Sequence, residues 1–136
     1  IGVTTAALSA VRAAARVIGL TEHSGKKPGR LIINRIRPTL VKHGDMLAAY
    51  DVIEFLAVDL LGVVPDDEAV IIGAHKGIPA SADQTSLAGK AFGNIARRIA
   101  GESVPYLPIL EERVGFWERL RASLLGRLGG RSERRG

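Results

Sequence analysis

The sequence contains no cysteine, and aromatic residues make up only 4% of its 136 residues. The absence of thiols excludes a disulfide framework, a thiolate metal site and a cysteine nucleophile. The histidines lie far apart and show no metal-ligand spacing: His23, His43 and His75. With so few aromatic residues, the core has to be built from Val, Ile, Leu and Ala, which is typical of a buried parallel sheet covered by helices.

Long apolar runs are also absent. No segment reaches the roughly 18 apolar residues that a membrane-spanning helix needs. The best candidate, residues 52–64, is interrupted by Glu54 and Asp59. The first residues lack the basic and apolar regions of a secretory signal. The sequence starts at Ile1, in what the pattern predicts to be the end of a strand, so we expect the chain to be part of a longer protein.

What the sequence does contain is an alternation of short apolar runs and amphipathic segments. The apolar runs predict buried strands at residues 1–5, 31–33 and 60–64. Apolar residues three and four positions apart predict helices at residues 6–19, 46–56 and 85–100. The predicted fold class is therefore α/β, with a parallel sheet flanked by helices.

The boundaries of these elements follow from capping and turn residues. Thr5 and Asp45 are the predicted N-caps of the first two helices, and Gly19 is the predicted end of the first one. Residues 21–29 and 65–84 carry glycine and proline, and they are predicted to be loops.

The pattern changes after residue 101. The next residues contain Pro105 and Pro108 and no periodicity, which is typical of a linker. The predicted organisation is an α/β domain at 1–101, a linker at 102–113, an amphipathic helix at 114–128 and a basic tail at 129–136.

The segment at 114–128 has the profile of an interfacial membrane anchor, with Trp, Phe and Leu on one face and arginines beside them. The residues predicted to contact lipid are Phe116, Trp117, Leu120, Arg121, Leu124, Leu125 and Leu128. Residues 111–136 contain seven Arg and four Glu, so they supply +3 of the chain's net charge of +5. Attraction to anionic lipid adds about 1 kcal/mol per basic residue near the surface. The alternative is that this helix packs on the domain's own hydrophobic surface.

Five stretches, in order, carry a family pattern along nearly the whole chain. They are Ser9-Ala10-Val11-Arg12, Leu31-Ile32-Ile33-Asn34-Arg35 with Gly44-Asp45-Met46-Leu47, Leu61-Gly62-Val63-Val64-Pro65-Asp66-Asp67 with His75-Lys76-Gly77-Ile78-Pro79, Ala88-Gly89-Lys90-Ala91-Phe92, and Gly115-Phe116-Trp117-Glu118-Arg119-Leu120. Together they resemble the C-terminal half of the MinD family, which belongs to the deviant P-loop ATPases along with the ParA partition proteins. The resemblance implies that residues 1–101 are the C-terminal part of an incomplete P-loop ATPase domain.

The resemblance also implies a nucleotide-binding role for two strand ends. The pair Asn34 and Arg35 would lie near the adenine ring, and Pro65 and Asp66 would flank the same base. Ligands of open α/β sheets bind at the carboxyl ends of the strands, and an asparagine amide can both donate to and accept from an adenine edge. The alternative is that Asn34 only begins a turn before Pro38.

A phosphate-binding loop is missing from this sequence. Such a loop needs a glycine-rich turn ending in Gly-Lys followed by Ser or Thr. Gly89-Lys90-Ala91 and Gly25-Lys26-Lys27 lack the hydroxyl residue, and the first is predicted to lie inside a helix. The family resemblance implies ATP and Mg²⁺ as cofactors of the complete protein, with the Mg²⁺ ligands and catalytic residues outside this chain. We expect the chain alone to be inactive as an ATPase.

The first predicted helix departs from the family pattern, which has Pro-Glu at its start and two aspartates after Val-Arg. These positions are Ala6, Ala7, Ala13 and Ala15 here. In the family this surface docks regulators called MinC and MinE, so Arg12 and Arg16 are the remaining candidates for a partner surface. The alternative is a helix that only packs through its alanines.

The function that the resemblance implies is division-site placement by an ATPase that dimerises with ATP, binds the inner face of the cell membrane reversibly and recruits MinC-like and MinE-like regulators. The expected location is therefore cytoplasmic and peripheral to the membrane, and no specific nucleic acid is expected as a partner. One alternative is a ParA-like partition ATPase that holds nonspecific DNA through basic residues, which the pI of about 10.1 supports. A related flagellar-placement ATPase and a non-enzymatic membrane-binding fragment are the others.

Overall fold

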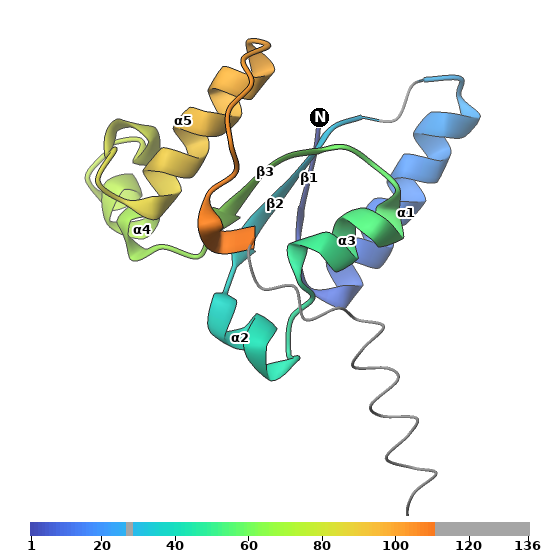
Figure 1. Cartoon of the computed structure of the whole chain (residues 1–136), viewed down its shortest axis with the longest axis horizontal. Helices are drawn as coiled ribbons and strands as arrows, with labels where there is room; N and C mark the ends of the chain where they lie inside the picture. The colour runs from blue at the N-terminus through green and yellow to red at the C-terminus, as the bar shows by residue number, and fades with distance from the viewer. Residues whose placement is uncertain (27–28, 111–136) are drawn as a thin grey trace, which may run out of the picture.

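The computed structural model describes residues 1–26 and 29–110, which form a three-stranded parallel sheet with helices on both faces (Figure 1). The strand order is β1-β2-β3, and the chain crosses from each strand to the next through helices. The strands are β1 (Gly2–Thr5), β2 (Leu31–Ile36) and β3 (Leu60–Pro65). The α-helices are α1 (Leu8–His23), α2 (Pro38–His43), α3 (Ala49–Leu56), α4 (Glu68–His75) and α5 (Leu87–Ile99). The predicted α/β fold class is confirmed.

One face of the sheet packs against α1, α2 and α3. Leu31 and Ile33 of β2 and Val63 of β3 point into this core, where they meet Val11 of α1 and Val52 of α3. All five side chains are buried. Since both connections between the strands run over this face, it holds the larger of the two hydrophobic clusters.

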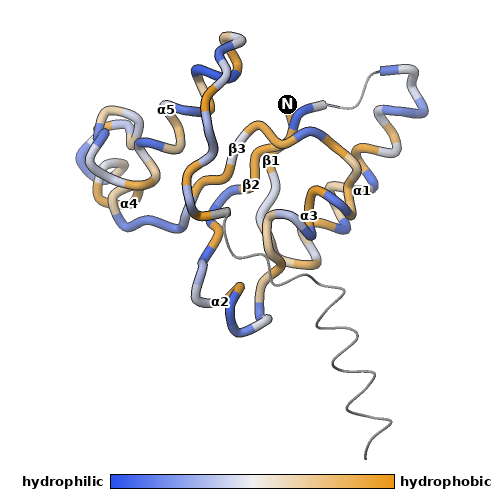
Figure 2. Tube along the Cα trace, in the orientation of Figure 1, coloured by the Kyte–Doolittle hydropathy of each residue, from blue (hydrophilic) through white to orange (hydrophobic). Residues whose placement is uncertain are grey.

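The opposite face is covered by α5, which lies along β3. Leu61 and Val64 contact Ala88, Ala91 and Ile95 in a second buried cluster. Figure 2 shows the run of hydrophobic residues along β3 that serves both clusters. Burial on both faces explains why this strand reads as a continuous apolar run rather than an alternating one.

A glycine sets the distance between α5 and the sheet. A Cβ atom at Gly62 would lie 2.3 Å from Cγ1 and 2.8 Å from Cδ1 of Ile95, so a larger residue would displace the Ile95 side chain. Contact with this side chain is therefore the structural reason for glycine at this point of β3.

The first helix differs from its predicted boundaries. It begins at Leu8 with Ala7 in the cap position and no side-chain cap, so the prediction of Thr5 as N-cap is wrong. It also continues through Gly19 to His23, so the predicted end at Gly19 is wrong; an interior glycine costs a helix only about 1 kcal/mol and does not by itself end it.

Two short helices were not predicted. Pro38 occupies the first turn of α2, where its missing N–H costs nothing, and Gly44 ends that helix in the left-handed conformation. The segment after β3 was predicted to be a loop, but residues 68–75 form α4 with Asp67 as its N-cap. Asp45 caps no helix, because α3 begins later, after Ala48.

The segment that follows α5 runs back along β3 and is held there by side chains. Arg98 donates to the main-chain carbonyls of Leu61 (3.0 Å), Val104 (3.0 Å) and Pro105 (2.8 Å). The Tyr106 ring lies 4.2 Å from the Arg98 guanidinium carbon, and its hydroxyl donates to the Leu60 carbonyl at 2.6 Å. Residues 104–110 therefore pack on the domain within the segment predicted to be a linker.

Candidate functional site

Polar side chains gather at the carboxyl edge of the sheet, where β2 and β3 end. Ile33 pairs with Val63 and Ile36 pairs with Pro65, so two residues of β2, Asn34 and Arg35, face one residue of β3. This arrangement is a β-bulge, which turns side chains out of the ladder and is common beside functional sites. The bulge is the local reason that the predicted pair stands apart from the core.

The backbone of the bulge is strained at Arg35. Its φ angle is +57°, a left-handed conformation that is uncommon for residues other than glycine. The Arg35 N–H donates to Oδ1 of Asn34 at 2.9 Å, which orients the amide. With Oδ1 engaged, the amide nitrogen Nδ2 is the group that Asn34 presents to a ligand, and Oδ1 keeps a second lone pair for accepting.

Asp66 ties the two strand ends together. Its N–H donates to the Ile36 carbonyl at 2.9 Å, and its carboxylate accepts from Nε of Arg35 at 3.2 Å and from Nε of Arg37. The hydrogen bond from Arg37, with a weaker one from Arg35, holds the pKa of Asp66 below its usual value of 3.8. The carboxylate is 20% exposed while the two arginine side chains are 63% and 52% exposed, so solvent screens the pair from the arginine side.

The neighbouring aspartate, Asp67, binds backbone N–H groups rather than arginine side chains. Oδ1 of Asp67 accepts from the Ala69 N–H at 2.9 Å, and its Oδ2 accepts from the Ala88 N–H at 3.1 Å. One carboxylate therefore caps α4 and also the first turn of α5. Asp66 faces the candidate site, whereas Asp67 joins the helices behind it.

The structure brings the four predicted base-site residues together at one edge: Asn34, Arg35, Pro65 and Asp66. Sequence reasoning missed Arg37, although an Arg-x-Arg pattern across from Pro-Asp was available as a signal. It also missed Thr5, which pairs in register with Asn34 and so lies at the same edge. The position of Thr5 at this edge follows only from the register between β1 and β2, so no local pattern in the sequence indicated it.

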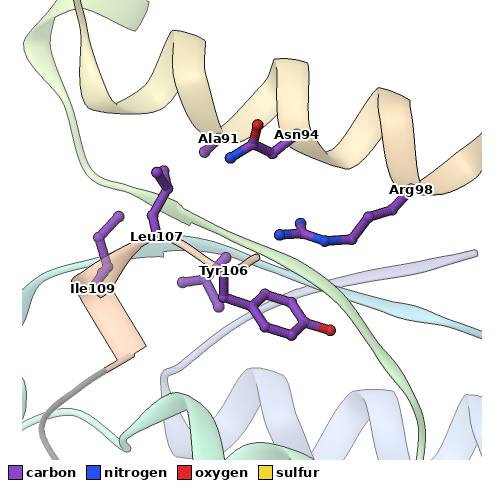
Figure 3. A pocket seen from close by; sticks show the side chains of 7 residues that line it. Ala91, Asn94, Arg98, Tyr106, Leu107 and Ile109 are labelled. Atoms are coloured by element: carbon purple, nitrogen blue, oxygen red, sulfur yellow. The ribbon is translucent and has the colours of Figure 1, made fainter. Parts of the chain in front are cut away.

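Two cavities lie near this region, and both are too small for a nucleotide, since ligand pockets are typically about 300 Å³ or more. The larger, about 170 Å³, is lined by Ile36, Pro38, Val41, Ala48, Ala49, Pro108 and Ile109. The smaller, about 10 Å³, is shown in Figure 3 and lies between α5 and the segment that Arg98 and Tyr106 hold. The polar edge, rather than either cavity, is therefore the candidate site.

The residues at this edge fit the base of a nucleotide better than its metal. The Asn34 amide has the donor and acceptor that an adenine edge requires. The Asp66 carboxylate already accepts from two guanidinium groups, so it does not fit as a Mg²⁺ ligand. Among residues 1–26 and 29–110, no three His, Asp or Glu side chains cluster in a way that would hold a metal ion.

The two Gly-Lys pairs of the described residues have ordinary structural roles. Gly89 lies in the first turn of α5, where its N–H bonds to the Ser86 hydroxyl and a Cβ atom would lie 1.8 Å from the Asp83 carbonyl oxygen. Gly25 follows the end of α1 with a φ angle of +74°, as a residue that closes a helix does. Neither forms a loop of N–H groups around a phosphate.

The structure describes only some of the other predicted site residues. Arg12 and Arg16 are both exposed on α1, so they are available to a partner. The predicted lipid contacts lie outside the described residues: Phe116, Trp117, Leu120, Arg121, Leu124, Leu125 and Leu128. Within the described part of the chain, no helix is long and apolar enough to cross a bilayer.

Comparison with known proteins gives clear relatives, although no protein-family model matches the chain. The chain is 42% identical over 125 residues to the septum site-determining protein MinD of Synechocystis sp.. It is 43% identical over 121 residues to the same protein of Bacillus subtilis. These matches cover 91% and 88% of this chain but 47% and 45% of the relatives. The chain thus spans about half the length of the curated relatives it matches.

Solved structures agree with these sequence matches. MinD of Aquifex aeolicus superimposes with a TM-score of 0.73 at 34% identity, covering 77% of this chain and 44% of that chain. The Aquifex aeolicus MinC:MinD complex gives 0.72 at 35% identity, with 76% and 43% covered. MinD of Pyrococcus horikoshii, solved with Mg-ADP, shares the fold with a TM-score of 0.61 at 23% identity, with 71% and 38% covered. Over the residues matched, this chain therefore belongs to the MinD family of septum site-determining proteins.

Proposed function

We propose that the carboxyl edge of the sheet is the base-binding part of an ATP site, in a protein that places the division site as an ATPase. The observation that carries this proposal is the bulge in β2, which presents the Asn34 amide beside Pro65 and Asp66 at the edge where α/β sheets bind ligands. The Mg-ADP bound by the fold relative from Pyrococcus horikoshii supports the nucleotide and the metal as cofactors of the whole protein.

The remaining functions belong to the whole protein and to the C-terminal segment. If ATP drives dimerisation, each dimer would carry two anchors of the kind predicted at residues 114–128. Binding of the second anchor would then be intramolecular, which raises the avidity for the membrane about 10²–10⁴-fold. Hydrolysis would then release the dimer from the inner face of the cell membrane. The MinC:MinD complex of the Aquifex aeolicus relative supports a MinC-like partner, for which Arg12 and Arg16 offer an exposed surface, and we extend this to a MinE-like regulator.

A nucleotide titration tests the base site. We expect ATP to shift the backbone NMR signals of Asn34, Arg35 and Asp66, and Asn34→Ala to abolish these shifts. Asn94→Ala on α5 is the matched control, because it removes a similar amide from the pocket in Figure 3. Equal shifts with GTP, or shifts confined to residues 25–26 and 89–90, would contradict the assignment of an adenine site.

Cosedimentation with anionic liposomes tests the anchor. The double variant Trp117→Glu and Leu120→Glu is expected to lose binding, because it places two charges on the predicted lipid face. The double variant Ala122→Glu and Ser123→Glu adds two charges to the predicted opposite face, and it is expected to retain most of the liposome binding. Equal loss in both variants would show that charge alone controls binding.

A ParA-like partition ATPase remains the second candidate, because the sequence pI is about 10.1 and two arginines of α1 are exposed. Nonspecific binding to DNA releases counterions, so the logarithm of the binding constant falls linearly with the logarithm of the salt concentration. We expect the chain to prefer anionic liposomes over duplex DNA in parallel salt titrations. Preferential binding to DNA that is unaffected by Trp117→Glu would favour the partition function instead.

A further inference from the structure

The cavity of about 170 Å³ near the carboxyl end of β2 is a groove with apolar walls. The end of β2 and α2 form one wall, the start of α3 forms the second, and the 3₁₀ turn η2 (Pro108–Leu110) forms the third. The residues that line it all have apolar side chains: Ile36, Pro38, Val41, Ala48, Ala49, Pro108 and Ile109. Any polar atom in the groove therefore belongs to the main chain, and the groove suits an apolar occupant rather than a polar ligand.

The groove lies where the described part of the chain ends. Pro108 and Ile109 line it, and Figure 1 shows the last described residues beside α2 and α3. This end is held in place, because Arg98 and Tyr106 donate to main-chain carbonyls of β3 and Ile109 packs against the larger core cluster. The segment that follows residue 110 therefore begins beside the groove.

Residues 114–128 are long enough and close enough to reach back into the groove. Trp117 follows Ile109 by eight residues, and an extended chain spans about 3.3 Å per residue, so about 26 Å of chain is available for the turn. A short tether gives an effective concentration of about 1 mM. A contact with a Kd of about 0.1 mM would then be occupied about nine-tenths of the time.

The predicted lipid face of this segment fits the groove in size. A cavity of about 150 Å³ lined by apolar side chains holds a benzene ring. The groove is slightly larger, at about 170 Å³, and no aromatic side chain lines it. It therefore has room for one aromatic side chain of the segment, and Trp117 is the only tryptophan of the chain.

Charge favours the same occupant. Residues 44–59, which lead into α3 and form it, contain four acidic residues and no Lys or Arg. Asp51 lies beside the groove, because its carboxylate accepts from the N–H of the lining residue Ala48 at 3.2 Å. Helix α2 ends in two basic residues, so the acidic wall is that of α3. This wall attracts residues 111–136, which carry seven Arg against four Glu, and it repels an anionic lipid surface.

We propose that this groove is the seat of the chain's own residues 114–128, whose apolar face binds there through Trp117 when no membrane is present. The same face is predicted to bind lipid, so the two contacts exclude each other; this second step rests on the proposed membrane function. A seat that is occupied nine-tenths of the time lowers the apparent affinity for a membrane about tenfold. The groove thus holds the anchor back until lipid competes for it.

The fluorescence of Trp117 tests the seat without a membrane, because no other tryptophan contributes. In the 136-residue chain we expect emission shifted to the blue and weak quenching by acrylamide. Ala48→Glu places a charge in the groove and should give the emission and quenching of a solvent-exposed tryptophan. Ala74→Glu, on the exposed surface of α4, is the matched control and should leave both unchanged.

A second pair of variants changes the segment and leaves the described domain untouched, so misfolding of the domain cannot account for its result. Leu120→Glu, on the predicted face of Trp117, should expose the tryptophan, whereas Ser123→Glu on the predicted opposite face should not. Free quenching of Trp117 in the wild-type chain, or equal quenching in Ala48→Glu and Ala74→Glu, would overturn the proposal. Shielding that increases with protein concentration would do the same, because it indicates a second copy as the occupant.

Binding to anionic liposomes separates the seat from the anchor. Ala48→Glu is expected to bind them about tenfold more tightly than the wild-type chain, because its segment is no longer docked. If Trp117 is shielded but neither protein binds liposomes, the seat stands and the membrane anchor fails. If Trp117 is exposed in solution and both proteins bind equally, the anchor stands and the seat fails.

Discussion

Replacing Asp67 with alanine removes the N-cap of α4 and also a hydrogen bond that its carboxylate accepts from the first turn of α5, whose own N-cap is Ser86. Its carboxylate accepts from the first turn of α4 at 2.9 Å and from the first turn of α5 at 3.1 Å. Loss of an N-cap costs about 0.5–2 kcal/mol, and a negative charge near a helix N-terminus contributes about 0.3–1 kcal/mol more. The two contacts together therefore correspond to about 2–3 kcal/mol of the free energy of unfolding.

Thermal unfolding followed by circular dichroism measures this effect. For a domain of this size, about 1 kcal/mol corresponds to roughly 4 °C in Tm, so Asp67→Ala is expected to lower Tm by about 8–12 °C. Asp67→Asn keeps one oxygen acceptor, so its Tm should lie between those of wild type and Asp67→Ala. The adjacent Asp66→Ala is the matched control and should lose much less, because its partners are exposed arginines. A Tm for Asp67→Ala at or above that of Asp66→Ala would refute the reasoning.

Two further predictions concern pH and the segment after α5. Because the folded pKa of Asp66 lies below 3.8, its ion pairs stabilise the fold above that pH and are lost as pH falls through the folded pKa. The Tm difference between wild type and Asp66→Asn should thus be constant from pH 5 to 7 and vanish in acid; a difference that grows in acid would contradict this. Arg98→Ala removes three hydrogen bonds to carbonyls, so hydrogen exchange of residues 104–110 should accelerate. Arg97→Ala, which loses only an exposed pair with Glu102, should leave that exchange unchanged, and equal acceleration in both would refute the role of Arg98.

The sequence and the structure agree best where a single local signal dominates. The apolar run before Pro65 predicts β3 because a strand buried on both faces needs apolar residues throughout. Helix α5 was predicted from its periodicity, and Ser86 caps it. The same reasoning failed for α4, because its residues are apolar on every side and Gly73 interrupts them, so no periodicity marks the helix.

The candidate site also combines features that the sequence predicted with features that only the structure shows. The family pattern predicted which residues would lie together, but not the ion pairs between Asp66 and the two arginines, which join residues 29 and 31 positions apart. It also did not predict the bulge at Asn34 and Arg35, because a bulge depends on how β2 pairs with β3. Strand pairing is a long-range property that no single segment encodes.

The sequence by itself determined the α/β class, the order of the strands along the chain and the family, because hydrophobic periodicity and ordered motifs are local properties of the chain. Only the tertiary structure decided which strand lies at the edge, which aspartate caps helices and which one binds arginines. Those outcomes depend on the register between strands and on the direction in which adjacent side chains point. Asp66 and Asp67 are identical in chemistry and adjacent in sequence, and their tasks differ because one faces the carboxyl edge and the other faces two helix N-termini.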